Sequence, residues 1–495
     1  MAGQSRREVL ADQIRARHRA SLPKDGQELQ LIRHEIGKQR AHLATRRLVE
    51  RAPKALTDIK PVFLMSPISV AQFLPPGKVE FDLLVIDEAS QVRPEDALGA
   101  IARAKQIVIV GDKKQLPPTS FFDRVLDDLD EDDNDETLEE SVQTTALESV
   151  LSACEARGMS SRMLTWHYRS RHPSLIEVSN DEFYDNRLFL PPSPNTTRGK
   201  TGLVINRVDG SYDRGGKRTN EIEARAVVNA VAAHAREYPD LSLGVVTFSI
   251  SQRDLIDDLL ELRRREDSEL DAFASINTRE PMFVKNLENV QGDERDAIII
   301  SIGYGPRIAN SGLDSMHFGP VSADGGERRL NVLFTRARAR CEVFASFSSG
   351  DIDLARTTKP GARVLQRFMR FAETGILDVP LPVGDPDSPF EEAVGKYIRT
   401  LNYVFDFQVG SAGFIIDLAV KHPDRPGEYI LAVECDGATY HSARWARERD
   451  RLRQQVLEDK GWHFHRIWST DWFRNPEKAK ARLAEAIEVA RIRSV

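Results

Sequence analysis

The chain has 495 residues and a net charge of −7, and 41% of its residues are hydrophobic. This is the composition of a globular protein of about three domains, and it excludes a disordered or collagen-like chain. No run approaches the ~18 consecutive apolar residues of a membrane span, and the first ten residues lack the apolar core of a signal peptide. Three widely separated cysteines, Cys154, Cys341 and Cys435, exclude a disulfide framework and a cysteine-based zinc site. We therefore expect a cytoplasmic protein with no membrane partner.

Residues 1–60 are predicted to form a basic helical arm. They hold 14 Lys and Arg against 7 Asp and Glu, and their apolar residues recur at helical spacing, as in ELQLIRHEIGKQRAHLATRRLVERA. A basic helix of this kind is most often a solvated surface, so its charge alone does not assign a ligand.

From Pro61 the pattern changes to short apolar runs, each followed by a loop and a helical stretch. The runs are PVFLMS, FDLLVIDE, QIVIVGD, TGLVINRV, LGVVTF, AIIISIGYG and CEVFASF. Buried strands that alternate with helices indicate a mostly parallel sheet covered on both faces. We predict two consecutive α/β units of this type.

An acidic run separates these two units. Residues 127–140 contain ten Asp or Glu and no basic residue, so the rest of the chain carries a net charge of +3. A modest positive remainder permits nucleic-acid binding through local patches. The run is predicted to be a solvated loop, and the alternative is a mimic of nucleic acid that occupies a binding groove.

A Pro-, Gly- and Asp-rich linker is predicted over residues 376–388, followed by a separate α/β domain over residues 389–495. Its expected elements are a helix from Pro389, strands at FIIDLAV, YILAVECD and HFHRIW, and an Arg-rich helix between the last two strands.

Two predicted strands of the first unit end in polar residues. Asp87 and Glu88 follow one strand, and Gln115 lies shortly after the next. The carboxyl ends of strands form the ligand-binding rim of an open α/β sheet. One carboxylate there can hold Mg²⁺ while its neighbour orients a water, and an amide can contact a terminal phosphate. This pattern indicates nucleotide chemistry.

Several motifs in this order resemble those of superfamily 1 helicases, on the nonsense-mediated-decay branch. They are VIDEASQ (motif II), GDKKQLPPT (III), LTWHYRSRHP, LGVVTFSISQ (IV), FVKNLENVQGDERDAII (V) and RRLNVLFTRAR (VI). The resemblance covers residues 61–375 and implies two RecA-like units, a partial one over 61–163 and a second over 164–375.

The same resemblance implies functional residues. Arg169 would reach the γ-phosphate, Gly292 and Glu294 would lie on the nucleotide side, and Arg336 would be the arginine finger. Ser66, in MSPISVAQF, matches a segment of the family that contacts nucleic acid. Because phosphoryl transfer is mostly positioning and charge neutralisation, guanidinium groups and Mg²⁺-binding carboxylates suit this chemistry.

The phosphate loop GxxxxGK[ST] of these helicases is absent from the sequence. The only GKT, at residues 199–201, has Pro194 where the first glycine should be and precedes a strand, so we interpret it as a turn. Preorganised backbone N–H groups are the binding site for the β-phosphate, and lysines elsewhere cannot replace them. We therefore expect the chain to resemble the C-terminal part of a larger helicase, with ATP bound only if the loop is supplied elsewhere.

A second group of carboxylates lies in the C-terminal domain. Asp417 is in the strand FIIDLAV, Glu434 and Asp436 are two residues apart at the end of YILAVECD, and Glu391 is on the preceding helix. Converging carboxylates are costly unless cations neutralise them, so they indicate Mg²⁺ or Mn²⁺ with oxygen ligands. The predicted metal ligands of the chain are Asp87, Asp417 and Glu434. Glu391 also completes a capping box with Ser388, which is an equal alternative.

The arrangement D…ExD, followed by His441 and an Arg-rich helix, resembles PD-(D/E)xK nucleases of the very-short-patch-repair type over residues 388–475. Asp436 stands where the commonest pattern has Lys, so activation of water falls to His441 or to a second metal. His441 as a structural histidine is the alternative. The resemblance places the chain in bacterial repair or phage defence.

The Arg-rich helix, residues 442–460, carries closely spaced arginines that can hold successive phosphates. Arg447 and Arg451 are the predicted nucleic-acid contacts, and salt bridging on a solvated helix is the alternative.

Together these features predict an α/β protein with two RecA-like units, the first incomplete, and a restriction-endonuclease-like domain. The expected function is nucleic-acid binding, with DNA favoured over RNA, and Mg²⁺-dependent endonuclease cleavage. ATPase or helicase activity is not expected of this chain alone. One alternative is an ATP-dependent helicase completed by a phosphate loop on a partner chain, and the other is a non-catalytic nucleic-acid-binding module.

Overall fold

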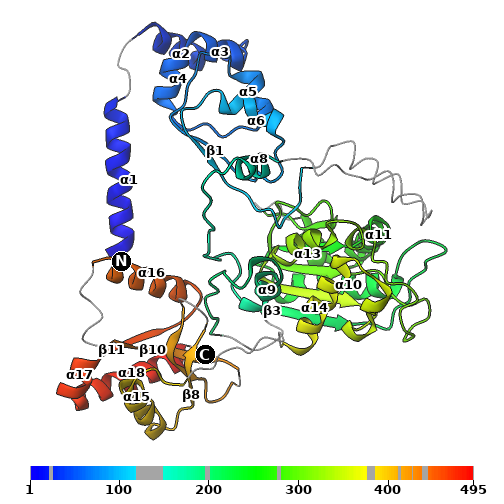
Figure 1. Cartoon of the computed structure of the whole chain (residues 1–495), viewed down its shortest axis with the longest axis vertical. Helices are drawn as coiled ribbons and strands as arrows, with labels where there is room; N and C mark the ends of the chain where they lie inside the picture. Colours follow the sequence, from blue (N-terminus) through cyan, green and yellow to red (C-terminus); the bar gives the residue numbers. More distant parts are fainter. Residues whose placement is uncertain are drawn as a thin grey trace. The chain divides into compact units, whose positions relative to one another are not determined.

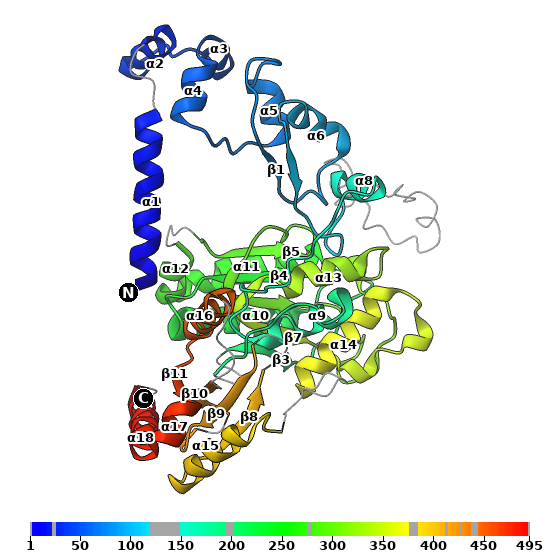
Figure 2. The same cartoon turned by 60° about the vertical axis from the view of Figure 1, so that its left-hand side comes forward.

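A computed structural model describes residues 2–21, 26–118, 149–194, 201–275, 280–375, 385–410, 414–425, 427–436 and 444–493 (Figures 1 and 2). The chain divides into two compact units, Met1–Ser161 and Arg162–Val495. Both units contain parallel strands connected through helices, so the predicted α/β fold class is confirmed.

The described part of the first unit is mainly helical. Its apolar residues at helical spacing form short helices, and three of them begin with proline, whose missing N–H needs no partner at that position. The helices are α1 (Ala2–Ser21), α2 (Gln27–Gly37), α3 (Thr45–Arg51), α4 (Pro53–Ile59), α5 (Pro67–Phe73), α6 (Pro94–Ile101) and α8 (Val150–Ala156). The helices predicted for the first 60 residues are present as α1 to α4.

Two strands of the first unit, β1 (Leu84–Ile86) and β2 (Ile107–Ile109), form a parallel pair. The strand predicted over residues 61–66 is wrong, because these residues form no strand. Phe63 and Met65 instead pack in a small apolar cluster with residues such as Leu74 and Val79. Packing against neighbouring helices therefore satisfies this apolar run without strand pairing.

The second unit contains a five-stranded parallel sheet in the order β3-β7-β6-β4-β5. Its strands correspond to β-branched runs of the sequence, with β5 as a short edge strand. They are β3 (Gly202–Arg207), β4 (Leu243–Thr247), β5 (Phe283–Asn286), β6 (Arg295–Ser301) and β7 (Ala337–Ala345). The parallel sheet predicted for this unit is confirmed.

Both faces of this sheet are covered. Ile299 packs in a cluster with α10 and α11 residues, while its neighbours Ile298 and Ile300 are equally buried on the opposite face. Phe334 and Phe368 stack between α13 and α14, with ring centroids 3.6 Å apart. The helices are α9 (Glu177–Tyr184), α10 (Glu221–Glu237), α11 (Ile250–Glu266), α12 (Ser268–Ser275), α13 (Gly326–Phe334) and α14 (Pro360–Thr374). Short 3₁₀ helices lie at Pro173–Leu175, Gly319–Val321, Ser349–Asp351 and Leu354–Arg356.

The C-terminal part of the second unit has its own mixed sheet in the order β11-β10-β9-β8, with β10 and β11 parallel and the other pairs antiparallel. Helices α15 and α18 pack against one face, and α16 lies on the other (Figure 1). The elements are α15 (Pro389–Thr400), β8 (Phe405–Val409), β9 (Ile416–Lys421), β10 (Tyr429–Asp436), α16 (Arg444–Asp459), β11 (Phe464–Trp468), α17 (Ser469–Arg474) and α18 (Pro476–Arg493).

Residues 162–194, here called the linking segment, contact both sheets of the second unit. The backbone N–H of Arg171 donates to the carbonyl of Arg338 on β7, at 2.6 Å. Toward the C-terminal sheet, Trp166 makes an edge contact with Phe414, with ring centroids 5.1 Å apart. The indole N–H of Trp462 donates to the carbonyl of Pro192 at 2.9 Å.

Candidate functional site

The parallel pairing of β1 and β2 brings the two polar groups of the first unit to one rim. The register pairs Ile86 with Ile109, so both strands end at the same level, and the N–H of Ala89 donates to the carbonyl of Val110 at 2.9 Å. Asp87 and Glu88 follow β1 directly, and Gln115 follows β2 after a short turn. The strand ends therefore bring the residues predicted for nucleotide chemistry to the same rim of the sheet.

The carboxylates at this rim are accessible. Asp87 and Glu88 are exposed, and Asp87 Oδ1 accepts the Glu88 N–H at 3.0 Å. Glu88 has a left-handed backbone, with φ of 52°, and its Oε2 accepts from Gln91 at 3.1 Å. The amide of Gln115 donates to Asp112 Oδ2 at 3.1 Å, so a neighbouring carboxylate orients it.

Ser66, the predicted nucleic-acid contact, is the N-cap of α5. Its Oγ accepts from the N–H of Ser69 at 3.2 Å and donates to Ser69 Oγ at 3.0 Å. This capping explains the residue type at position 66, because an N-cap serine satisfies an otherwise unpaired helix N–H. Its role toward nucleic acid stays a prediction.

Two residues predicted to lie near nucleotide are brought together in the second unit. Arg169, in the linking segment, forms an ion pair with Glu294 just before β6, with Nε and Oε2 2.7 Å apart. Gly292, two residues earlier, has φ of 87° in a turn, a conformation that L side chains rarely adopt. The helicase-like motifs around Arg169 and Glu294 thus share one face of this unit.

Arg336, the predicted arginine finger, is buried. It lies between α13 and β7 with 3% of its surface exposed. Its Nε donates to the carbonyl of Val332 at 2.8 Å, and Nη2 donates to Thr335 Oγ1 at 2.9 Å. In this conformation the guanidinium secures the end of α13, and its role toward nucleotide stays a prediction.

The carboxylates of the C-terminal sheet gather on the face that α16 covers. The antiparallel register of β9 and β10 pairs Leu418 with Val433, which sets Asp417 beside Glu434. Side chains two residues apart on a strand share a face, so Asp417 lies with Ala419 and Glu434 with Ala432, and both alanines pack in the apolar cluster that contains α16 residues.

Burial and mutual repulsion shift the acidity of these groups. The pKa of Asp417 is raised to about 7, first by burial and then by Glu434, although the N–H of Cys435 donates to Asp417 Oδ2 at 2.7 Å. Burial also raises the pKa of Glu434. The pKa of the Cys435 thiol is raised by burial and then by Asp417, Glu391, Glu434 and Asp436.

Two arginines that the sequence did not single out hold these carboxylates. Arg453 of α16 forms a bidentate pair with Glu434, with Nη1–Oε2 and Nη2–Oε1 distances of 3.0 and 2.9 Å. Arg466 of β11, which pairs in register with Glu434, has its Nε 3.2 Å from Asp436 Oδ2. The Arg-rich pattern of α16 predicts phosphate contacts or salt bridges on a solvated helix, and neither alternative identifies Glu434 as the partner of Arg453.

Glu391 caps its helix, as the capping-box alternative predicted. Its N–H donates to Ser388 Oγ at 3.2 Å, and Ser388 Oγ donates to Glu391 Oε1 at 2.9 Å. The amide of Gln408 also donates to Glu391 Oε2 at 2.7 Å, from a left-handed backbone with φ of 52° on β8. Glu391 is thus fixed beside Asp417, where it adds negative charge.

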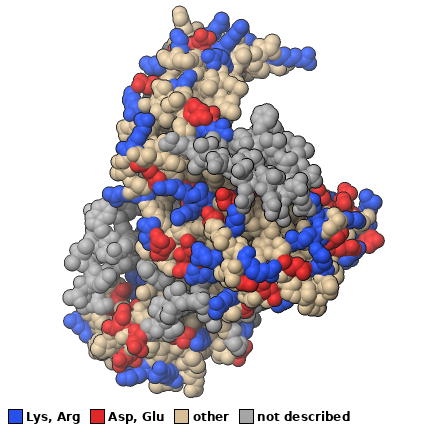
Figure 3. Space-filling view, turned by 45° about the vertical axis from the view of Figure 1, so that its right-hand side comes forward, with Lys and Arg blue, Asp and Glu red and all other residues tan. Residues whose placement is uncertain are grey.

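Four predictions lie wholly or partly outside the described residues: His441, the acidic run 127–140, the linker over residues 376–388, and the side chain of Arg447 within α16. Arg451 is described and is exposed on α16. On the face drawn in Figure 3, the described Lys and Arg side chains are interspersed with Asp and Glu rather than gathered in one patch.

The carboxylate group fits a divalent cation in charge and in donor chemistry. Arg453 pairs with Glu434 and Arg466 pairs with Asp436, while Asp417 next to Glu434 accepts only the N–H of Cys435 among the contacts described above. Within the described ranges no three His, Cys, Asp or Glu side chains are grouped closely enough to form a metal cage. Mg²⁺, however, is usually held by one or two carboxylates with waters and substrate phosphates, and Asp417 with Glu434 provides such a pair.

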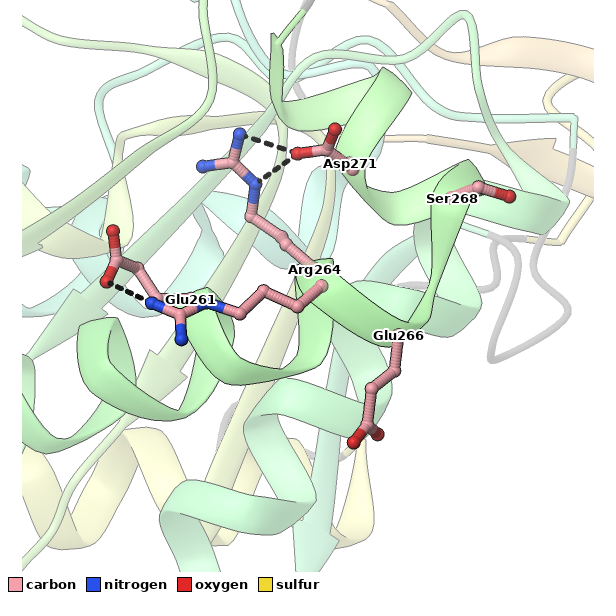
Figure 4. A pocket seen from close by; sticks show the side chains of 6 residues that line it. Glu261, Arg264, Glu266, Ser268 and Asp271 are labelled. Carbon is pink, nitrogen blue, oxygen red and sulfur yellow. Dashed lines mark hydrogen bonds and ion pairs between the residues drawn. The ribbon is translucent and has the colours of Figure 1, made fainter.

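A surface hollow on α11 and α12 contains none of the predicted site residues (Figure 4). Its charged side chains pair with one another: Arg264 lies 2.9 Å from Asp271, and Arg265 lies 3.9 Å from Glu261. Exposed pairs of this kind contribute little and are not a catalytic arrangement.

Three family models match separate stretches of the chain. Two are described as AAA domains, AAA_11 over residues 8–122 and AAA_12 over residues 143–348. The third, REase_MTES_1575, matches residues 390–487, which include Asp417, Glu434 and Asp436. The chain joins helicase-like domains to a restriction-endonuclease-like domain.

Similar proteins agree with the helicase-like part. An uncharacterized ATP-dependent helicase, MG140 of Mycoplasma genitalium, is 31% identical over 458 residues, which are 88% of this chain and 39% of that protein. The DNA polymerase alpha-associated DNA helicase A of Saccharomyces cerevisiae is 27% identical over 53% of this chain and 38% of its own length. The chain therefore spans about two fifths of the length of these relatives.

A solved structure of PRRSV helicase aligns with 59% of this chain and 39% of its own, at 13% identity and a TM-score of 0.25. Among the described helices, none has the length and apolar character needed to cross a membrane.

Proposed function

We propose that this chain is a helicase-related nucleic-acid-binding protein whose C-terminal domain is a Mg²⁺- or Mn²⁺-dependent endonuclease, resembling PD-(D/E)xK enzymes of the very-short-patch-repair type. The observation that carries the proposal is the pair of half-buried Asp417 and buried Glu434, which lie side by side on adjacent strands. Its biological setting is proposed to be bacterial DNA repair or phage defence.

Asp417 and Glu434 would hold the cation, which when bound orients a water and stabilises the leaving oxygen in phosphodiester hydrolysis. Asp436 shares the face of Glu434 and pairs with Arg466, so it would supply a further carboxylate close to the cation. Exposed Arg451 on α16 would bind a backbone phosphate and position the strand.

The decisive experiment is a cleavage assay on single- and double-stranded DNA and on RNA, with Mg²⁺, Mn²⁺ or EDTA. We expect cleavage of DNA that EDTA abolishes and that Asp417→Asn reduces by at least about 100-fold, because one metal ligand is lost. Asp424→Asn is the matched control, since Asp424 is exposed in the turn after β9. Cleavage that survives Asp417→Asn, or no cleavage of any substrate, would contradict the proposal.

A second candidate function is ATP-dependent helicase activity completed by a phosphate loop on a partner chain. The rim formed by β1 and β2, with accessible Asp87 and Glu88 beside Gln115, favours it. An ATPase assay in the presence of a polypeptide that carries GxxxxGK[ST] tests this candidate. Glu88→Gln is the control, because it keeps the side-chain shape and removes the carboxylate that would orient water.

A further inference from the structure

Helix α16 holds one of the proposed metal ligands. The guanidinium of Arg453 engages both oxygens of Glu434, at 3.0 and 2.9 Å, and also donates to the carbonyl of Ile415. The Glu434 side chain is only 6% exposed. A planar guanidinium on a carboxylate in this bidentate geometry occupies the same oxygens that a hard divalent cation would need.

The other end of α16 is attached to the linking segment. Lys460, one residue beyond the helix, donates from Nζ to the carbonyl of Ser170, next to Arg169. Its own N–H donates to the carbonyl of Val456 at 3.2 Å, so it continues the last helical turn. Trp462, which is 2% exposed, donates to the carbonyl of Pro192 and fixes the chain that follows.

Arg453 and Lys460 therefore belong to one continuous helical stretch. Seven residues separate them, which is two helical turns and roughly 10 Å along the helix axis. Residues at this spacing lie on the same face. A displacement of the linking segment at Ser170 is carried by the helix to the guanidinium that covers Glu434.

We infer that α16 acts as a latch on the proposed nuclease site, which means that it can block or release a metal ligand. The latch is closed when Arg453 is bound to Glu434. The contact of Lys460 with the linking segment holds it in the closed position. This inference rests on the proposed function and adds its regulation. While the latch is closed, a cation must displace Arg453 from at least one oxygen of Glu434. When the Lys460 contact is released, Glu434 becomes available to the cation.

The test measures Mn²⁺ affinity directly, by electron paramagnetic resonance of free Mn²⁺, on the full chain without nucleic acid. Arg453→Met keeps an unbranched apolar stem and removes the competing charge. We expect this variant to bind Mn²⁺ at least about tenfold more tightly, because without the closed state a larger fraction of the molecules has Glu434 available to the cation. Arg453→Lys, which cannot bridge both oxygens, should give an intermediate affinity. Lys460→Met should tighten binding severalfold while leaving Arg453 in place.

Arg474→Met and Lys478→Met are the matched controls, because both residues are exposed in the same domain and neither is part of the proposed latch. One outcome would overturn the latch and leave the nuclease proposal standing. In that outcome the wild type binds Mn²⁺ and needs Asp417 to do so, but Arg453→Met and Lys460→Met bind Mn²⁺ no more tightly than the wild type. If neither the wild type nor any variant binds Mn²⁺, both proposals fail. Arg453→Lys and Lys460→Met keep the test decisive should Arg453→Met not fold.

Discussion

Glu223, near the start of α10, is a fully buried carboxylate at the carboxyl ends of β6 and β7. It accepts hydrogen bonds from Ser301 Oγ and the Gly303 N–H, both at 2.7 Å, and from Ser346 Oγ at 3.2 Å. Burial outweighs these bonds and raises its pKa to about 7 from the ordinary value of 4.5. A buried acid of this kind makes folding depend on pH.

We predict that stability falls as pH rises from about 4.5 to about 7, because in this window the folded state holds the Glu223 proton and the unfolded state does not. Below the window both states are protonated, and above it the folded state must bury a charge. The loss is on the order of 3 kcal/mol. Glu223→Gln should remove this part of the pH dependence in thermal melts at the two ends of the window. The exposed neighbour Glu221→Gln should retain it, and an unchanged slope in Glu223→Gln would contradict the assignment.

At the residue scale, the sequence predicted which carboxylates belong to the candidate site but not which residues pair with them. Asp417 and Glu434 could be predicted from their positions in apolar strands, because a carboxylate in such a strand is costly unless a cation or another partner neutralises it. Arg453 lies among several arginines in one helix, and which of them turns inward depends on the position of α16 on the sheet. Gln408 could not be found from the pattern either, since its contact with Glu391 joins two elements whose relative placement is set by tertiary packing.

At the scale of elements, α13 and α14 begin close to the same backbone group. A Cβ added at Gly361 would overlap the carbonyl oxygen of Val321, a backbone atom that cannot turn aside. We predict that Gly361→Ala lowers the free energy of unfolding by about 1–3 kcal/mol, the usual cost of overpacking. Denaturant unfolding measures the loss. Gly350→Ala is the control, because the nearest atom to its added Cβ is 3.7 Å away, and an equal effect at both positions would contradict this explanation.

Two strands that the sequence did not predict are edge strands. β5 (FVKN) and β8 (FDFQV) lie at the ends of their sheets and contain Lys, Asn, Asp or Gln, so they lack the continuous apolar run of a central strand. The strand that was wrongly predicted over residues 61–66 has a related cause. An apolar run indicates that residues are buried, but it does not indicate whether they pack against a strand or a helix. Central strands such as β4 and β6 were predictable because every residue of β4 is buried.

For the molecule as a whole, the sequence holds acidic and amide groups that are predicted to act in nucleotide chemistry but no GxxxxGK[ST] loop. We predict that the purified chain shows no nucleic-acid-stimulated ATP hydrolysis, since nothing cradles the β-phosphate. Phosphate release with and without single-stranded DNA measures it. Turnover that disappears in Glu88→Gln would prove this prediction wrong, whereas turnover that persists in that variant would indicate a contaminating ATPase.

Glu88 keeps a left-handed backbone that costs an L residue roughly 1–2 kcal/mol and that glycine adopts freely. Selection for heat resistance alone would therefore favour glycine at this position and discard the carboxylate. Selection for nucleotide chemistry would favour the strained glutamate. Engineering that scores only melting temperature should hold position 88 fixed, because there the substitution that improves the fold removes the carboxylate that is predicted to orient water.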